Sequence, residues 1–409
     1  MVIYPDTWIK YPFDQFFKLI SNNTLSRDKL SESGEVGNIH YGDVLIKYGE
    51  IITDKDSIPR IKEPIEINDN NFLQKNDVIL ADTAEDETVG KVSQVGDVSI
   101  PLVGGLHTVV CRPQKETADG YLGYYMNSRY YHDQLLPYIT GIKVSSVSKK
   151  SLNETHIVIP CDIEEQKAIV DIFSDIDQHL TNLTELIEKK RNLRDGALAD
   201  LLCCRTRLPG FKDEWKEKSF DDFIKINRGA SPRPIEHYIT TNRNGVNWIK
   251  IGDAPRFGKY ITTTEERITQ SGAAHSKRVN AGDFILSNSM SFGRPYLLAI
   301  DGCIHDGWLR LYDFQSDACA DFLFYLLSSS YVKKQYETLA AGSGVQNLNK
   351  EVVKQVVVNL PSIPEQKAIA DVLTSMDEEI EALEKEREKV LQIREGTIDD
   401  LLTGRVRLK

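Results

Sequence analysis

The most basic stretch of the chain is residues 225–260, where seven Lys and Arg side chains stand against two acids. Cationic side chains bind phosphates, and Arg or Lys also pairs with the edge of guanine, whereas Asn or Gln pairs with adenine. The stretch is therefore a candidate nucleic-acid face. A solvated loop that happens to be basic is an equally simple alternative.

Side chains that could make such contacts fall at matched places in the two halves of the chain. In the second half they lie in predicted loops, except Lys250, which ends a predicted strand: Arg228, Arg233, Arg243, Asn244, Lys250, Asn288, Arg294, Gln346 and Asn347. In the first half the matched positions are Lys47, Asp82, Thr83, Lys91, Lys143, Ser145, Ser146 and Lys149. Any one of these residues has a plain surface role as an alternative, whereas two matched sets favour DNA contact.

The places match because the two halves repeat one pattern of short elements. Runs of β-branched and aromatic residues broken by Gly-Asp, Asn-Asp or Asn-Gly predict short strands joined by turns. Residues 121–136 and 322–337 each predict one helix. The repeated segments are 8–19 with 215–226, 44–51 with 247–254, 75–83 with 281–289, 89–91 with 292–294, and 141–150 with 342–351.

A much stronger repeat follows each mixed segment. Residues 163–208 align without a gap to 363–408, with 19 of 46 positions identical, and Glu-Gln-Lys-Ala-Ile stands near the start of both copies. Apolar residues recur at intervals of four and three, which predicts a helix of ~60 Å with one apolar seam facing a partner helix, as in a coiled coil. Asp162 and Ser362, each three residues before a Glu, predict capping boxes.

Some polar and small residues recur inside these predicted helices. Gly196 and Gly396 each cost roughly 1 kcal/mol relative to Ala in a helix, which predicts close helix approach or a bend. The recurring charged residues are expected on solvated faces, with subunit docking as the alternative: Asp177, Asp377, Arg194 and Arg394.

The predicted helices also carry the excess acid of the chain. Residues 163–202 have a net charge of −4 and residues 363–402 a net charge of −7, which together equal the −11 of the whole chain. The remaining residues are balanced overall, so the mixed segments are free to be locally basic.

The order of the segments predicts an α+β fold with two pseudo-repeated mixed α/β domains separated by two long helices. The first helix leaves the first domain and enters the second, and the second helix has to point back, so the helices are expected to be antiparallel. Trp8 corresponds to Trp215 and Leu408 to Leu208, which is the pattern of a circular pseudo-two-fold arrangement cut once.

Catalytic and membrane signals are missing from the sequence. It contains no phosphate-binding G-x-x-x-x-G-K-[ST], no H-E-x-x-H and no Asn/Asp-Pro-Pro-aromatic stretch. An apolar run of membrane length and a signal peptide are also missing. The six scattered cysteines are expected to be reduced thiols of a cytoplasmic protein.

The layout resembles the specificity subunit of type I restriction–modification systems. The resemblance rests on the two Glu-Gln-Lys-Ala-Ile openings at 165–169 and 365–369, each after a short β-like run, and covers essentially the whole chain. It implies target-recognition domains at 1–155 and 209–355, a central conserved helical region at 156–208 and a C-terminal one at 356–409. Val144-Ser145 stands where the second half has Val345-Gln346, a departure that concerns loop contacts in the first domain.

The resemblance also implies partners. Each recognition domain would read one half of a bipartite, asymmetric site on double-stranded DNA, and the helices would set the spacer and dock two methyltransferase subunits. Two restriction and translocase subunits would join through the complex. The chain would bind no cofactor itself, and S-adenosylmethionine, ATP and Mg would belong to the partner subunits.

Two other classes of function remain open at this point. One is a coiled-coil adaptor that binds proteins through its end domains, which the basic stretch 225–260 disfavours. The other is a single-chain restriction or modification enzyme, which the missing catalytic motifs disfavour.

Overall fold

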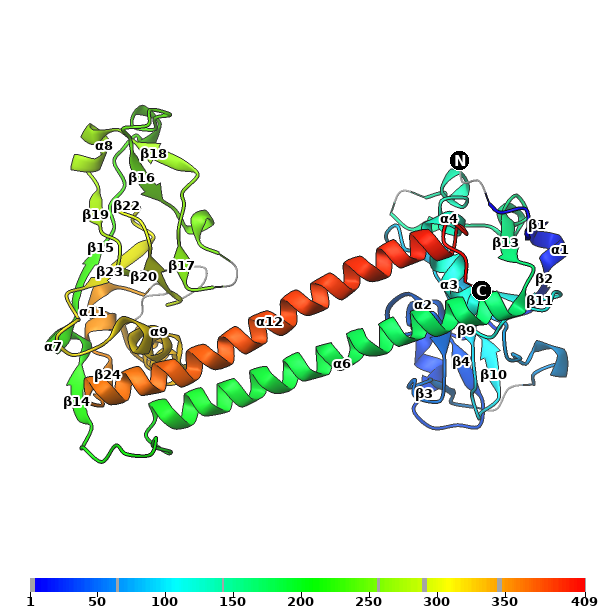
Figure 1. The fold of residues 1–409 in the computed structure, drawn as a ribbon, viewed down its shortest axis with the longest axis horizontal. Helices are drawn as coiled ribbons and strands as arrows, with labels where there is room; N and C mark the ends of the chain where they lie inside the picture. Colours follow the sequence, from blue (N-terminus) through cyan, green and yellow to red (C-terminus); the bar gives the residue numbers. More distant parts are fainter. Residues whose placement is uncertain are drawn as a thin grey trace. The chain divides into compact units, whose positions relative to one another are not determined.

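The computed structural model describes residues 4–63, 66–141, 143–255, 258–288, 293–343 and 348–408. The chain divides into two compact units: unit 1 is Met1–Thr184 with Glu386–Lys409, and unit 2 is Glu185–Lys385. Two long helices, α6 (Ile163–Leu202) and α12 (Ile363–Leu401), each contribute one part to unit 1 and one part to unit 2 (Figure 1). The predicted α+β class and the two long helices are confirmed.

The mixed domain of unit 1 is built from short strands and short helices. The strands are β1 (Trp8–Pro12), β2 (Phe17–Ile20), β3 (Leu30–Ser31), β4 (Gly37–Ile39), β5 (Ile51–Ile52), β6 (Arg60–Ile61), β7 (Val78–Ala81), β8 (Thr83–Ala84), β9 (Val92–Val95), β10 (Leu102–Gly104), β11 (Thr108–Pro113), β12 (Ser145–Ser146) and β13 (His156–Pro160). The helices are α1 (Phe13–Phe16), α2 (Tyr41–Ile46), α3 (Tyr121–Asn127), α4 (Arg129–His132) and α5 (Lys149–Leu152). The main sheet has the order β2-β11-β7-β9-β5, a second sheet has the order β10-β4-β6-β3, and β1 pairs with β13.

The mixed domain of unit 2 repeats this plan. Its strands are β14 (Lys216–Ser219), β15 (Lys225–Arg228), β16 (Val246–Ile249), β17 (Tyr260–Ile261), β18 (Glu266–Ile268), β19 (Lys277–Val279), β20 (Phe284–Ser287), β21 (Pro295–Leu298), β22 (Gly302–Ile304), β23 (Trp308–Tyr312) and β24 (Val357–Leu360). Its helices are α7 (Phe220–Phe223), α8 (Gln270–Ala274), α9 (Ala320–Ser328), α10 (Ser330–Ser343) and α11 (Lys350–Lys354). The main sheet, β15-β23-β20-β21-β17, has the strand order of its counterpart, and in both sheets the last strand pairs in parallel and the others antiparallel.

A tight turn before the central strand of each main sheet explains one of the sequence repeats. Asn76 and Gly282 both have positive φ, of 72° and 90°, and these residue types adopt that conformation most readily. The Asp that follows each of them accepts a backbone N–H across the turn and binds an arginine of the neighbouring strand: Asp77 with Arg112 and Asp283 with Arg310. The prediction of strands joined by Asn-Asp and Gly-Asp turns is confirmed here.

The single helix predicted over 121–136 and over 322–337 is wrong in both domains. Each segment forms two helices, α3 with α4 and α9 with α10, that meet at an extended serine, Ser128 or Ser329. The hydroxyl of each serine donates to the carbonyl three residues earlier, at 2.6 Å. This local hydrogen bond competes with helix continuation, which an apolar period alone does not reveal.

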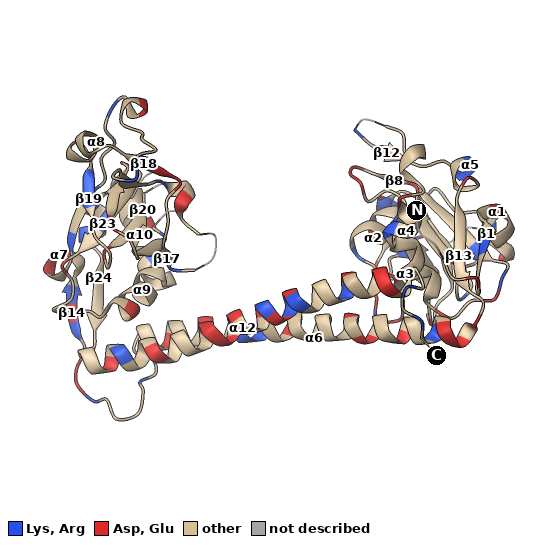
Figure 2. Ribbon diagram, turned by 45° about the horizontal axis from the view of Figure 1, so that its top comes forward, with Lys and Arg blue, Asp and Glu red and all other residues tan. Residues whose placement is uncertain are grey.

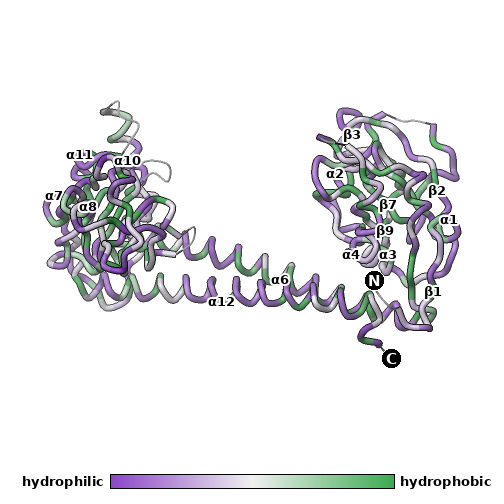
Figure 3. The backbone as a smooth tube through the Cα atoms, turned by 90° about the horizontal axis from the view of Figure 1, so that it is seen from above, coloured by the Kyte–Doolittle hydropathy of each residue, from purple (hydrophilic) through white to green (hydrophobic). Residues whose placement is uncertain are grey.

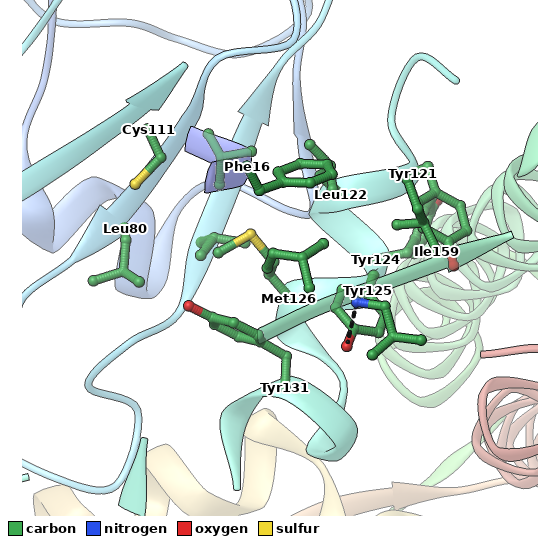
Figure 4. Close-up of a cluster of buried hydrophobic side chains, with 14 of the residues drawn as sticks. Phe16, Leu80, Cys111, Tyr121, Leu122, Tyr124, Tyr125, Met126, Tyr131 and Ile159 are labelled. Carbon is green, nitrogen blue, oxygen red and sulfur yellow. Dashed lines mark hydrogen bonds between the residues drawn. The ribbon is translucent and has the colours of Figure 1, made fainter. Parts of the chain in front are cut away.

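Each unit has its own main hydrophobic core. In unit 1 the core gathers side chains of the main sheet, of α3 and of the first turns of α6 (Figure 4). The hydroxyl of Tyr125 within this core accepts a hydrogen bond from the backbone N–H of Val158, at 3.1 Å. Figure 3 shows apolar segments gathered inside the domains, whereas the long helices are mostly hydrophilic along their length.

The repeated glutamine of the two helix openings fastens each helix to its domain. The side chain of Gln166 accepts from the backbone N–H of Ala118, at 2.9 Å, and donates to the carbonyl of Pro160, at 2.8 Å. Gln366 makes the matching bonds with Cys319 and Pro361, at 2.9 and 3.0 Å. Both glutamines are buried, and buried polar groups need hydrogen-bond partners, which these bonds provide.

The repeated glutamate does not close a capping box, contrary to the sequence prediction. The buried carboxylate of Glu165 binds Arg407 through two hydrogen bonds, and that of Glu365 binds Arg207 in the same way, at 2.9 and 2.7 Å. Asp162 still caps α6 by accepting from the N–H of Glu164. Each glutamate therefore joins the start of one long helix to the segment that follows the other.

Within each unit the two long helices run antiparallel. In unit 1 Asp177 of α6 binds Arg394 of α12, and in unit 2 Arg194 of α6 binds Asp377 of α12. Both aspartates also accept a hydrogen bond from a tyrosine of the mixed domain, Tyr124 or Tyr325. Solvated faces were expected for these charged residues; they instead connect helix to helix and helix to domain.

Two further expectations about the helices are corrected. The apolar seam does not face only the partner helix, because Ile169 and Phe173 lie in the core of unit 1 and Ile369 in the core of unit 2. Close helix approach does not explain Gly196 and Gly396, because a Cβ at either position would meet nothing within 4 Å.

Candidate nucleic-acid interface

The turn between β22 and β23 collects three of the candidate DNA-binding residues of unit 2. The carbonyl of Asp306 accepts from the side chains of Arg228, at 3.1 Å, and Asn288, at 2.9 Å. Its carboxylate accepts from the hydroxyl of Ser231, at 2.8 Å, and pairs with Arg233, at 3.3 Å. Because β15, β20 and β23 are adjacent strands, their ends and loops meet at this turn.

A groove of about 680 Å³ opens beside this turn, and its lining includes Arg233, Trp248, Lys250 and His305. The side chain of Arg233 is 81% exposed and that of Lys250 is 30% exposed, so the guanidinium and the ammonium group are both accessible from solvent. A concave surface with two accessible cations suits a nucleic-acid backbone.

Each of the two cations of the groove pairs with an acidic side chain and still remains accessible from solvent. Lys250 pairs with Glu266, at 2.9 Å, and this hydrogen bond raises the pKa of the lysine. This partly exposed ion pair contributes little to stability, so a phosphate can replace the carboxylate of Glu266. Burial lowers the pKa of His305, which favours a neutral imidazole in the groove.

Three further candidates of unit 2, Arg243, Asn244 and Arg294, are not among the residues that line this groove. Arg243 and Asn244 are exposed in the loop before β16, and the guanidinium of Arg294 lies 5.1 Å from the ring centre of Tyr296. Gln346 and Asn347 lie outside the described residues.

In unit 1 the matching region is a polar cluster with a different chemistry. Thr83 donates to Asp82, at 2.8 Å, and lies 3.3 Å from the imidazole of His107. Ser145 and Ser146 form β12, which pairs with β8 and places both serines next to this cluster. The structure therefore brings together four residues of the predicted set, Asp82, Thr83, Ser145 and Ser146.

The lysines of unit 1 are spread more widely. Lys143 and Lys149 are exposed, at two ends of the segment that includes β12. The half-buried Lys91 donates to the carbonyls of Leu45 and Tyr48, at 2.9 and 3.3 Å, where α2 ends. Burial lowers the pKa of Lys91, and its ammonium already satisfies helix carbonyls, so its contact with DNA stays a prediction with less support.

The sequence match between Lys47 and Lys250 is wrong. Strands β4 and β16 are counterparts, because β4 pairs in parallel with β10 and β16 pairs in parallel with β22. The residue that follows β4 is His40, so His40 is the counterpart of Lys250, whereas Lys47 lies at the end of α2 and donates to the carbonyl of Ser57. The two segments have similar sequences, but they occupy different positions relative to the matched strands β4 and β16.

Four residues of the two sites were missed in the sequence: Ser231, His305 and Asp306 in unit 2, and His107 in unit 1. The Asp306-Gly307 pair, between two β-like runs, is a turn signal that could have placed Asp306 at a loop tip beside the basic stretch. Nothing in the spacing of Ser231 or His107 pointed to their partners.

Other kinds of site find no support in the described part of the chain. No group of three or more His, Cys, Asp or Glu side chains there could hold a metal ion. None of the described helices combines the length and the apolar character that a membrane span needs.

Comparison with known proteins shows one family over most of the chain. The sequence model of the family described as "Type I restriction modification DNA specificity domain" matches residues 5–191 and again residues 212–392. The putative type I restriction enzyme MjaX specificity subunit of Methanocaldococcus jannaschii is 26% identical over 348 residues, or 81% of this chain and 79% of that protein. The MjaVIII specificity subunit of the same organism is 27% identical over 294 residues, or 66% of each chain.

Solved structures share the fold. A type I restriction–modification S subunit from M. genitalium has a TM-score of 0.57 at 16% identity, with 96% of both chains covered. A chain from a structural study of the assembly and conformational transition of a type I restriction–modification system has a TM-score of 0.66 at 17% identity, with 99% of this chain and 100% of that chain covered.

Proposed function

Because the chain belongs to the family of type I restriction–modification DNA specificity proteins, we propose that it reads a bipartite, asymmetric site on double-stranded DNA, one half with each mixed domain. As a specificity subunit the chain recognises DNA and is not itself the catalytic subunit. The single observation that carries the proposal is the main sheet built twice with different polar side chains at one matched turn: Asp82 with Thr83 in unit 1, Asn288 in unit 2.

The chemistry of the two matched turns supports different half-site sequences. Asn can pair with adenine and Arg with guanine, whereas a carboxylate such as Asp82 accepts from the amino group of cytosine. The same backbone frame with different donors and acceptors would therefore select different bases. The domain boundaries 1–155 and 209–355, with helical regions 156–208 and 356–409, are part of this proposal.

The long helices are proposed to set the spacer between the half-sites and to dock two methyltransferase subunits. Acidic and basic residues follow one another along α6 and α12 (Figure 2), so their exposed faces offer charged contacts to a partner. Two restriction and translocase subunits would join through the complex. S-adenosylmethionine, ATP and Mg would be held by these partners, which supply the chemistry.

A selection experiment tests the proposal. The chain is co-purified with its methyltransferase subunit and used to select duplexes from a random library. The expected result is a consensus with two short conserved blocks and an unconserved gap of fixed length. A complex that enriches no sequence, or one continuous block, would contradict the proposal.

The separate roles of the two domains are tested with the same library. Replacing the exposed Arg233 by Ala should relax the preferred bases in one block and leave the other block as it was. A change in both blocks would argue against one domain per half-site.

A further inference from the structure

The turn residue Asp306 is the common partner of four side chains at the proposed DNA-binding surface of unit 2. Ser231 and Arg233 contact its carboxylate, and Arg228 and Asn288 contact its carbonyl. These partners come from β15, from the loop after it and from the end of β20, so the turn connects segments far apart in the sequence.

An acid at the centre of a surface that has to bind a polyanion is unfavourable for binding by charge alone. A carboxylate near phosphates weakens attraction to every DNA sequence equally. A carboxylate at this point therefore needs a role that outweighs its repulsion of phosphates, and the contact between Asp306 and Arg233 suggests that role. Arg233 is 81% exposed and would otherwise be free to adopt many rotamers, whereas the carboxylate of Asp306 limits its directions.

We propose that Asp306 is a positioning residue for DNA specificity, which orients Arg233 and Ser231 so that they read the second half-site. The inference rests on the proposed function of the chain. In this proposal Asp306 does not itself contact the bases. Its charge lowers the affinity for all DNA sequences, and its hydrogen bonds fix the orientation of Arg233 and Ser231. The hydrogen bond from Ser231 lowers the pKa of Asp306, consistent with a charged carboxylate in this arrangement.

In unit 1 the matched turn is built differently. The backbone N–H of Gly105 and that of His305 both bond to the carbonyl that ends the matched strand, so Leu106 is the counterpart of Asp306. The first domain thus has no carboxylate at this position, and its cluster is organised by Asp82, which precedes Thr83 on a different segment. The proposed role is therefore specific to the second half-site.

The test uses the full chain in complex with its methyltransferase subunit and four variants: Asp306→Asn, Arg233→Ala, the double variant, and Asp313→Asn as a control. Asp313 lies just after the other end of β23, has positive φ and pairs with Lys225, so its substitution removes the same charge from the same unit. Binding is measured on the selected duplex, on duplexes with one changed base in either half-site, and on a scrambled duplex.

Asp306→Asn is expected to reduce discrimination in the second half-site by about tenfold while it leaves discrimination in the first half-site unchanged. Affinity for the scrambled duplex should rise, because a negative charge is lost. In the Arg233→Ala background the same substitution should have little further effect on discrimination, and Asp313→Asn should not alter discrimination.

Two results would overturn the inference. Unchanged discrimination in Asp306→Asn would show that the carboxylate has no positioning role. An undiminished effect in the Arg233→Ala background would show that Asp306 does not act by orienting Arg233. Intact discrimination in the first half-site reports that the variants are folded, and a wild-type complex without any sequence preference would instead contradict the proposed function.

Discussion

At the scale of single residues, the buried carboxylate of Glu365 joins three segments of unit 2. It accepts from Arg207 through two hydrogen bonds and from the indole of Trp215, at 3.2 Å. A buried charge is tolerated only where it is paired and hydrogen-bonded. Glu165 has the matching arginine partner, Arg407, in unit 1.

Arg207→Ala should therefore be severely destabilising. It leaves the carboxylate of Glu365 buried without its charged partner, which costs about 3–5 kcal/mol. The free energy of unfolding from urea titration measures this loss. Arg205→Ala is the matched control, because Arg205 forms an exposed pair with Asp200 and should cost no more than about 1 kcal/mol. Similar losses in both variants would contradict the account of the buried pair.

Lys250→Ala should weaken DNA binding by the methyltransferase complex. If Lys250 reads a base, discrimination at one position falls by about 1–3 kcal/mol; if it binds a phosphate, all sequences weaken alike and the salt slope falls by about one. The control is Lys225→Ala, which removes an exposed lysine at the opposite end of β15 from Arg228. Equal effects of both variants would place the DNA on a different face.

At the scale of elements, the sequence repeat predicts the long helices well, because an apolar period sustained over many turns is a strong signal. It predicts the short elements less well, because Ser128 and Ser329 interrupt helices through a single local hydrogen bond. The match of Lys47 to Lys250 fails for a related reason: strand register is set by pairing with β10 and β22, not by similar letters. Site residues were predicted where the residue type alone suggests DNA contact, and they were missed where only contacts between distant segments reveal them, as with Ser231 and His107.

The two mid-helix glycines give a prediction at this scale. A Cβ at Gly196 or Gly396 would meet nothing, so substitution by Ala should stabilise the free chain by about 1 kcal/mol at each position. Thermal unfolding measures the effect. Gly293→Ala is the opposite control, because its φ of 71° and its crowding by Tyr336 predict destabilisation. Destabilisation by Ala at 196 would show that the helix needs the glycine for its own geometry.

At the scale of the whole molecule, helix length should set the preferred gap between half-sites. Both long helices cross from one compact unit to the other, at Thr184–Glu185 in α6 and Lys385–Glu386 in α12. Four residues inserted at both places lengthen each helix by ~6 Å. The preferred gap should grow by about two base pairs, at ~3.4 Å each, while both half-site sequences stay the same.

Binding to a library with fixed half-sites and a variable gap measures this change. Insertion into α6 alone is the comparison, since it should disturb the pairing of the two helices within the units and weaken binding at every gap. An unchanged gap after the double insertion would show that helix length does not set the distance between the half-sites.

The C-terminal segment of the chain completes the core of unit 1, and the first half of the chain contains a matching segment of its own. Unit 1 uses Arg394, Leu401, Leu402 and Arg407 of the C-terminal segment, and the same residue types stand 200 positions earlier at Arg194, Leu201, Leu202 and Arg207. A polypeptide that stopped after residue 208 would contain the mixed domain of unit 1 and also a segment that can complete the same domain of a second copy. Such a truncated chain should form a homodimer, with the mass of two copies in light scattering, and should select a palindrome in place of an asymmetric sequence. A nonsense mutation near the middle of the gene would then create a new specificity instead of abolishing one.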